Sequence, residues 1–153
     1  MKFASAYSLH HGDMAWEERD QSDWLTDLFE APQITVEPGC TGKIRNHLRD
    51  ELTNAGWSYN VRIDPRLDLT VTGMSRDLAF QVQTGNISRA MYDLLKLQYL
   101  FEHKKIEAAA LAVPTKKAAD IIASNVSNVD RVWAELQFFD RIVTVPLLVV
   151  AFE

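Results

Sequence analysis

The sequence predicts an α/β or α+β domain in which helices flank a central mixed β-sheet. Apolar residues recur at helical spacing over residues 41–56 and 87–101, as in amphipathic helices. Short runs rich in apolar and β-branched residues, such as 106–114 and 142–152, are typical of buried strands. Because helices alternate with strands along the chain, we expect helices to pack against one sheet.

Composition sets the broad class. A chain of 153 residues with 47% hydrophobic residues is expected to form a single domain, residues 1–153. The only cysteine, Cys40, cannot form an internal disulfide, which fits a reducing compartment. The apolar run at 142–152 falls short of the roughly 20 residues that a membrane-spanning helix needs. The sequence therefore predicts a cytoplasmic protein with no membrane segment.

The net charge of −5 argues mildly against a protein that coats nucleic acid through bulk positive charge. It does not exclude a local basic face beside an acidic catalytic centre.

The first elements are weakly marked. Residues 1–40 are predicted to be polar and irregular, with one short helix that turns Trp24, Leu25 and Leu28 to one side. The proline and glycine at 38–39 mark a break. A helix is then expected over 41–56, with Thr41 as a possible cap and Gly56 as the stop.

The remaining elements follow in a clear order. Strands are predicted at 57–64, 67–73 and 78–83, and the last two are joined by a GMSRD turn. After the helix at 87–101 come the strand 106–114, helices at 116–125 and 129–139, and the strand 142–152. Pro146 is expected to place part of this last strand near a sheet edge.

The strand at 78–83 carries an unusual polar pair. Side chains alternate along a strand, so Gln81 and Gln83 share one face, while Phe80 and Val82 share the other. Asp68 precedes them on the neighbouring strand, and the hairpin is expected to bring it close to Gln81. An acid, a second acid-type position and a polar residue two positions later form the arrangement of a metal-dependent nuclease.

The chemistry explains this choice of residues. The charge of a phosphodiester repels a nucleophile, and Mg²⁺ held by carboxylates neutralises the developing charge and lowers the pKa of a bound water. Magnesium needs only one or two carboxylates together with a substrate phosphate.

The run FQVQTGNISRAMYDLLKLQYLF, residues 80–101, resembles the BglII/BstYI-like type II restriction endonucleases of the PD-(D/E)XK nuclease superfamily. The resemblance is strongest over residues 60–115. It implies a restriction-endonuclease-like core and a Glu-x-Gln motif in place of the usual Glu-x-Lys. Gln83 matches the glutamine of that motif, whereas Gln81 stands where the family has glutamate.

This departure affects the expected activity. An amide is nearly isosteric with a carboxylate, but it is neutral, holds Mg²⁺ far less well and cannot accept a proton. We therefore expect the chain to bind DNA and to cleave it poorly or not at all. Two explanations stay open: an engineered Glu→Gln change that traps an uncleaved complex, or a natural variant that takes its second metal ligand from elsewhere.

The resemblance also implies roles for individual residues. Asp68 and Gln81 occupy the Mg²⁺-holding positions, Gln83 orients the attacking water, and Glu51 is the candidate for a further acid from the preceding helix. Asp64 is the alternative motif aspartate, although it lies further from the hairpin.

A homodimer that cuts a short palindrome in double-stranded DNA is the implied assembly, because two-fold protein symmetry matches a palindromic site. The candidate DNA contacts are Asn86, Ser88 and Arg89 at a helix start, and Lys116 and Lys117.

Simpler interpretations compete with each of these. The two glutamines would also suit the solvated face of an edge strand, Glu51 a solvated helix, Lys96 an exposed position, and the apolar stripe at 91–101 either core or a dimer interface. For the whole chain, the alternatives are a non-catalytic DNA-binding protein with a nuclease fold and an unrelated α/β interaction domain.

Overall fold

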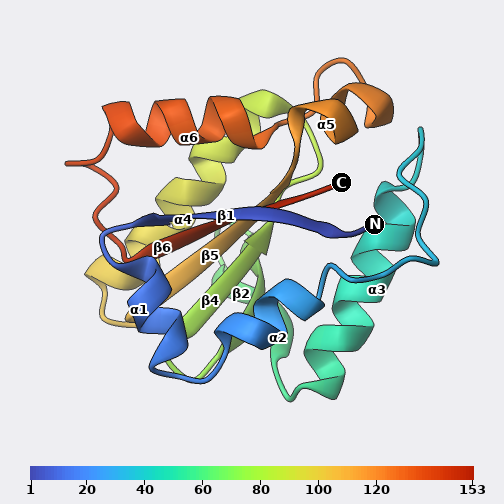
Figure 1. Ribbon diagram of the computed structural model, residues 1–153. Coiled ribbons are helices and arrows are strands. Elements are labelled where there is room, and N and C mark those ends of the chain that lie inside the picture. The colour runs from blue at the N-terminus through green and yellow to red at the C-terminus, as the bar shows by residue number, and fades with distance from the viewer.

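A six-stranded mixed sheet runs through the centre of the molecule and carries helices on both faces (Figure 1). The computed structural model describes all residues, 1–153. The strands lie in the order β1-β6-β5-β4-β3-β2. The elements are β1 (Phe3–Leu9), α1 (Gly12–Glu17), α2 (Ser22–Asp27), α3 (Thr41–Asn54), β2 (Ser58–Asp64), β3 (Leu69–Ser75), β4 (Leu78–Val82), the 3₁₀ turn η1 (Ile87–Arg89), α4 (Ala90–Glu102), β5 (Ala108–Pro114), α5 (Lys116–Ile122), α6 (Val129–Phe138) and β6 (Leu147–Phe152).

The middle of the sheet is parallel and its two sides are antiparallel. Strands β4, β5 and β6 run parallel, while β1 joins β6, and β2 and β3 join β4, in antiparallel pairs. Every residue of β5 and β6 is buried, as expected for parallel strands covered on both faces.

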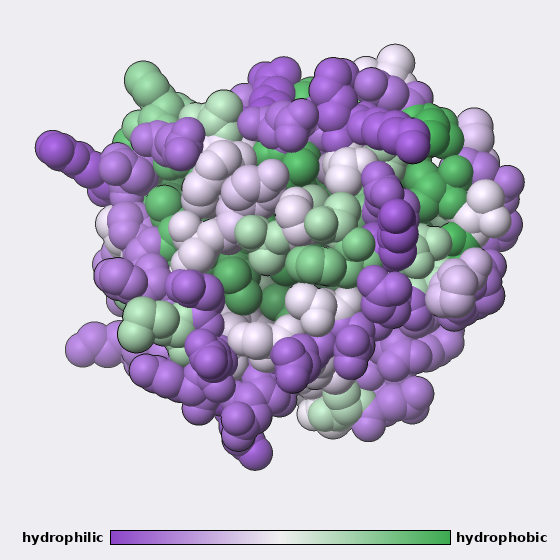
Figure 2. Space-filling model, viewed as in Figure 1, coloured by the Kyte–Doolittle hydropathy of each residue, from purple (hydrophilic) through white to green (hydrophobic).

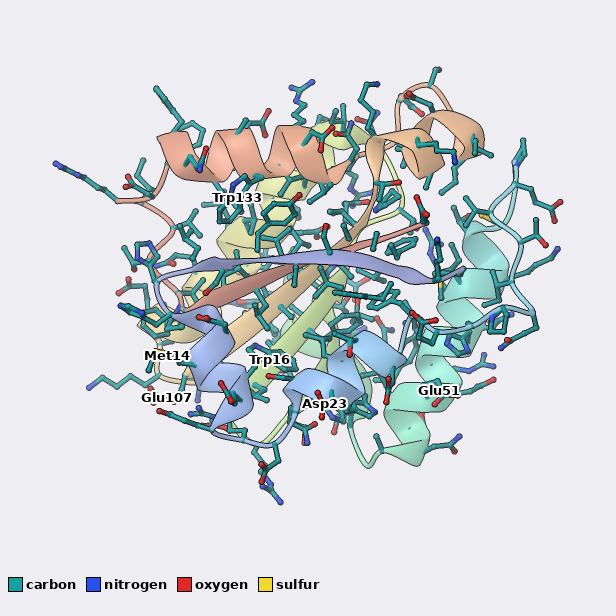
Figure 3. All side chains as sticks on the ribbon, in the orientation of Figure 1. Met14, Trp16, Asp23, Glu51, Glu107 and Trp133 are labelled. Atoms are coloured by element: carbon teal, nitrogen blue, oxygen red, sulfur yellow. The ribbon has the colours of Figure 1, made fainter.

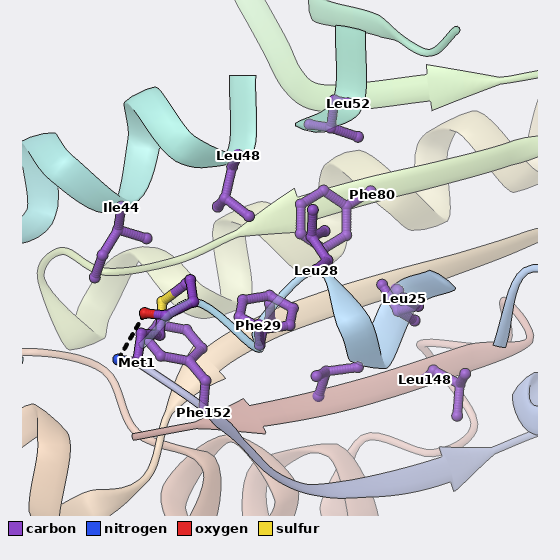
Figure 4. Close-up of a cluster of buried hydrophobic side chains, with 14 of the residues drawn as sticks. Met1, Leu25, Leu28, Phe29, Ile44, Leu48, Leu52, Phe80, Leu148 and Phe152 are labelled. Atoms are coloured by element: carbon purple, nitrogen blue, oxygen red, sulfur yellow. Dashed lines mark hydrogen bonds between the residues drawn. The ribbon is translucent and has the colours of Figure 1, made fainter. Parts of the chain in front are cut away.

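One face of the sheet packs against α1, α2, α3 and α5. Phe29 stacks on Phe152, with ring centroids 5.1 Å apart, and lies at a tilt to Phe80. Leu48 and Leu52 of α3 complete this part of the core (Figure 4). The alanines of β5 leave room for these aromatic rings beside the sheet.

The opposite face packs against α4 and α6. Leu94 and Leu97 of α4 and Val132 and Leu136 of α6 are fully buried against the alternate side chains of β5 and β6. The expected apolar stripe of residues 91–101 is therefore mainly core.

Helix α1 is anchored directly to the central strand. Trp16 is fully buried, and its indole N–H donates to the carbonyl oxygen of Ala109 over 3.0 Å. Figure 3 shows this side chain between α1 and the sheet.

Across the same view, apolar side chains gather where β1 crosses the sheet, and hydrophilic side chains surround them (Figure 2). None of the helices is long and apolar enough to span a membrane.

Most predicted elements are confirmed within a few residues. The helix expected at 41–56 is α3, which is followed by Gly56 at φ 78°, a left-handed conformation that glycine adopts without steric cost. The strand expected at 57–64 is β2, and the one at 106–114 is β5. The mixed sheet flanked by helices is confirmed as well.

Two predictions about the ends of the chain are wrong. The stretch 1–40 is not simply irregular, because residues 3–9 form the edge strand β1 and α1 precedes the expected helix α2. The last strand is shorter than predicted and lies inside the sheet, between β1 and β5. Pro146 stands just before β6, so its missing N–H costs the ladder nothing.

Helix α1 approaches β6 closely at Gly12, and a substitution there tests this contact. A methyl group at Gly12 would overlap the backbone carbonyl of Leu147, whereas nothing lies within 4 Å of one at Gly42 in α3. We predict that Gly12→Ala lowers the free energy of unfolding by about 3 kcal/mol. Gly42→Ala should leave it unchanged or raise it by about 0.5–1 kcal/mol, because alanine favours helix. Urea denaturation measures both, and equal stability of the two variants would contradict this packing.

Candidate functional site

The sheet opens between β3 and β4. Only residues 73–75 of β3 pair with residues 78–80 of β4, and the first half of β3 pairs with β2 alone. On the side facing β4, side chains bind the backbone groups that this half of β3 leaves without a strand partner. The amide N–H of Thr72 donates to Gln81 Oε1 over 3.0 Å, and Lys96 Nζ donates to the carbonyl oxygen of Thr70 over 2.7 Å. Gln81 thus takes the place of a ladder partner.

A cavity of about 530 Å³ lies at this opening. Its wall combines α3 on one side of the sheet, α4 on the other, and the strands and loop between them. It is lined by Arg45, Leu48, Tyr59, Asn60, Thr70, Thr72, Gln81, Val82, Gln83, Thr84, Gly85, Asn86, Arg89, Asp93 and Lys96. Most of these side chains are polar, which suits a polar ligand better than an apolar one.

Thr72 and Gln81 form a locked pair at the centre of the wall. The Thr72 hydroxyl lies 3.4 Å from Gln81 Oε1 and accepts a hydrogen bond from the N–H of Val82 over 3.1 Å. The Gln81 amide nitrogen donates to the carbonyl oxygen of Val82 over 3.3 Å. Two oxygens that bind one Mg²⁺ are at most about 4 Å apart. Positions 72 and 81 therefore have the spacing of two ligands for one ion, but neither side chain is charged.

A second polar network lies deeper, between the strand end and α4. Gln83 donates from its amide nitrogen to Asp93 Oδ2 over 2.6 Å and accepts from the N–H of Gly85 over 2.7 Å. Lys96 Nζ lies 2.7 Å from Asp93 Oδ1, and the two side chains are only 11% and 7% exposed. Both oxygens of the one carboxylate in the cavity wall are thus engaged by protein donors.

This donor set does not fit a magnesium ion. Magnesium in proteins is bound through one or two carboxylates, usually with water and substrate phosphate. Asp93 is committed to Lys96 and Gln83, and the amide and hydroxyl of Gln81 and Thr72 are neutral. No group of three or more histidine, cysteine or acidic side chains in the structure has a geometry that would hold a metal ion.

The aspartates considered as motif acids lie elsewhere. Asp68 is not on the strand but in the β2–β3 turn, with φ 52°, a side chain 78% exposed and a 2.7 Å ion pair to Arg62. Asp64 binds the same turn, because its carboxylate accepts from the backbone N–H groups of Arg66 and Leu67. The hydrogen bond from the Arg66 side chain, helped by these N–H groups, lowers the pKa of Asp64 to about 2. Neither carboxylate reaches the cavity.

The hairpin explains this difference. The predicted GMSRD turn is tighter than expected, since β3 continues through Ser75 and only Arg76 and Asp77 make the turn. The register therefore places Thr72, rather than Asp68, beside Gln81.

The other predicted site residues divide into two groups. Asn86 and Arg89 line the cavity, whereas Ser88 does not and instead donates from its N–H and hydroxyl to Asn86. Glu51 lies on α3 outside the cavity wall (Figure 3). The predicted DNA contacts Lys116 and Lys117 are on α5, also away from the cavity. Lys116 forms an ion pair with Asp120.

Some residues of the site were missed by sequence reasoning. Arg45, Tyr59 and Asn60 reach the cavity from α3 and β2, elements far from the motif in sequence. Lys96, considered as an ordinary exposed lysine, is nearly buried against Asp93. The i,i+3 spacing of that acid and base on one helix was the available signal.

The buried ion pair gives a direct stability test. Lys96→Met leaves Asp93 buried without its cationic partner, so we predict a loss of about 3–5 kcal/mol in the free energy of unfolding. Adding Asp93→Asn should recover much of that loss, because the uncompensated charge is removed. Lys116→Met, which breaks the exposed pair with Asp120, is the control and should cost less than about 1 kcal/mol. Urea denaturation measures all three, and a Lys96→Met protein as stable as the parent would refute this assignment.

Comparison with known proteins identifies solved structures and a protein family that share this architecture. The chain superimposes on a crystal structure of the restriction endonuclease BglII complexed with a DNA 16-mer, with a TM-score of 0.80, 16% sequence identity, and coverage of 99% of this chain and 76% of that one. The corresponding values for free BglII are 0.73, 18%, 100% and 80%. No curated protein sequence matches. The family model of the restriction endonucleases BglII and BglIII matches residues 4–152, nearly the whole chain, so this protein belongs to the BglII/BglIII restriction endonuclease family.

Proposed function

We propose that this chain is a double-stranded DNA-binding protein of the type II restriction endonuclease kind, directed at a short palindromic site, whose Mg²⁺-dependent cleavage is disabled. Membership of the family and the fold shared with a DNA-bound endonuclease support DNA as the ligand. The observation that carries the disabled state is the Thr72–Gln81 pair, which fills two adjacent ligand positions with neutral groups.

The rest of the cavity wall still offers polar side chains to DNA. Gln83 and Asn86 remain at the opening of the sheet, and Arg89 lies beside them at the start of α4. A duplex placed against this opening would contact these polar side chains.

We propose a cytoplasmic location for the protein, as expected for an enzyme family that acts on DNA.

Restoring the acids tests the function. We predict that the chain gives no discrete plasmid fragments with Mg²⁺, whereas Thr72→Asp combined with Gln81→Glu does. The double variant should cleave at least about a hundredfold faster, because even outer partners of metal ligands change metal affinity or activity 10–100-fold. Sequencing of the fragment ends would then give the recognition site.

A matched control separates site chemistry from a change in net charge. Thr35→Asp combined with Gln137→Glu makes the same two chemical changes at exposed positions outside this cavity and should not cleave. Cleavage by the unaltered chain would contradict the disabled state. Binding without cleavage by the double variant would show that more than these two acids is missing, and the absence of any duplex binding would remove the proposed function altogether.

We also propose that two copies associate, as a palindromic site requires. The supporting feature is the outer side of α4, where Tyr92, Leu95 and Tyr99 are 43%, 52% and 44% exposed. They border an apolar groove of about 320 Å³ with Leu67 of the β2–β3 turn. Exposed apolar side chains gathered in one groove are typical of an interaction surface, and a second copy would cover it symmetrically.

A charge placed in this groove tests the association. Leu95→Glu sets two like charges against each other across a two-fold interface, so we predict that it converts dimer to monomer. Ile121→Glu makes the same kind of change at a 43% exposed position on α5 and should leave the dimer intact. Light scattering coupled to size-exclusion chromatography measures both masses, and a monomeric parent chain would refute the homodimer.

A further inference from the structure

We propose that the cavity binds one backbone phosphate through Arg45 and Arg89, with no metal ion, so that these two guanidinium groups neutralise the phosphate charge in place of a Mg²⁺ ion held by carboxylates. The inference rests on the proposed function, because it names how the same site holds DNA.

The cavity wall is positive in a negative protein. It contains three cationic side chains and one carboxylate, a net formal charge of +2, while the whole chain carries −5. Lys96 and Asp93 neutralise each other at 2.7 Å. The excess charge therefore belongs to Arg45 and Arg89, and neither of them takes part in an ion pair or side-chain hydrogen bond in the structure.

The wall also offers neutral donor groups that keep a hydrogen for a ligand. Thr84 lines the cavity at 4% exposure, and its hydroxyl makes no hydrogen bond within the protein. Gln81 and Gln83 are 8% and 7% exposed, and each donates only one amide hydrogen to the protein. These atoms are not sealed off from the cavity, since the one fully buried side-chain polar atom without a partner is Ser127 Oγ, so their remaining hydrogens can be donated to a ligand that accepts hydrogen bonds.

The chemistry of these groups selects a phosphate. Guanidinium groups match phosphate oxygens in geometry and stay charged at all relevant pH values. A phosphodiester brings one negative charge and several acceptor oxygens, which suits two arginines and three neutral donors. A metal ion would add positive charge to a wall that is already positive and would find no free carboxylate there.

The test is duplex binding in EDTA over a series of salt concentrations. The parent chain should bind a 20-base-pair duplex in EDTA as tightly as with Mg²⁺. Arg45→Gln and Arg89→Gln should each weaken binding about tenfold and lower the slope of log K against log salt by about 0.9, the value for one lost phosphate contact. Arg141→Gln removes the same charge from an exposed arginine outside the cavity and should change neither quantity.

The outcomes separate this inference from the proposed function. Duplex binding that EDTA abolishes, or that both cavity variants leave unchanged, overturns the phosphate site and leaves DNA binding standing. If no duplex binds, the proposed function fails, and inorganic phosphate in EDTA becomes the probe. Shifts of the Gln81 and Gln83 side-chain amide signals in NMR spectra, lost in Arg45→Gln, would then support the site. Their absence would overturn it.

Discussion

The hydrogen bond from the Thr72 N–H to the Gln81 side chain spans the opening between β3 and β4, and the site depends on this arrangement. Two strands that part in the middle of a sheet leave backbone groups without partners, and buried unpaired groups of this kind are costly. On β3, the Gln81 side chain accepts from the N–H of Thr72, and the Lys96 side chain donates to the carbonyl oxygen of Thr70. The cavity can thus reach from one helical layer to the other without breaking the fold.

The same interaction shows that the proposed loss of cleavage requires no change in the fold. A carboxylate at position 81 would accept the Thr72 N–H as the amide does, so the strand opening does not distinguish glutamate from glutamine. The electrostatic balance does distinguish them. With Asp93 already paired to Lys96, neutral side chains at positions 72 and 81 leave the wall with net positive charge, which is suited to an anion and not to a divalent cation.

The sequence predicted what periodicity controls. Helices α3 and α4 and strands β2 and β5 follow from their apolar patterns, and the alternation of Phe80 with the two glutamines gave the correct faces of β4. It missed β1, whose alternation of small residues in FASAYSL resembles no strong strand signal. It also misplaced the last strand, because a proline beside a strand indicates an edge only when it lies within the paired residues.

The site was predicted only where it is local in sequence. Gln81, Gln83, Asn86 and Arg89 lie within nine residues of one another and do meet at the cavity. The partner of Gln81 depended on the hairpin register, and a difference of a few residues in the turn replaced Asp68 by Thr72. This difference matters most for the site, since the one expected acid is replaced by a neutral threonine and both positions of the pair are then neutral. A family motif read along one strand therefore locates the centre of such a site, while its charge, and with it the capacity for cleavage, is set by residues that only the three-dimensional register brings together.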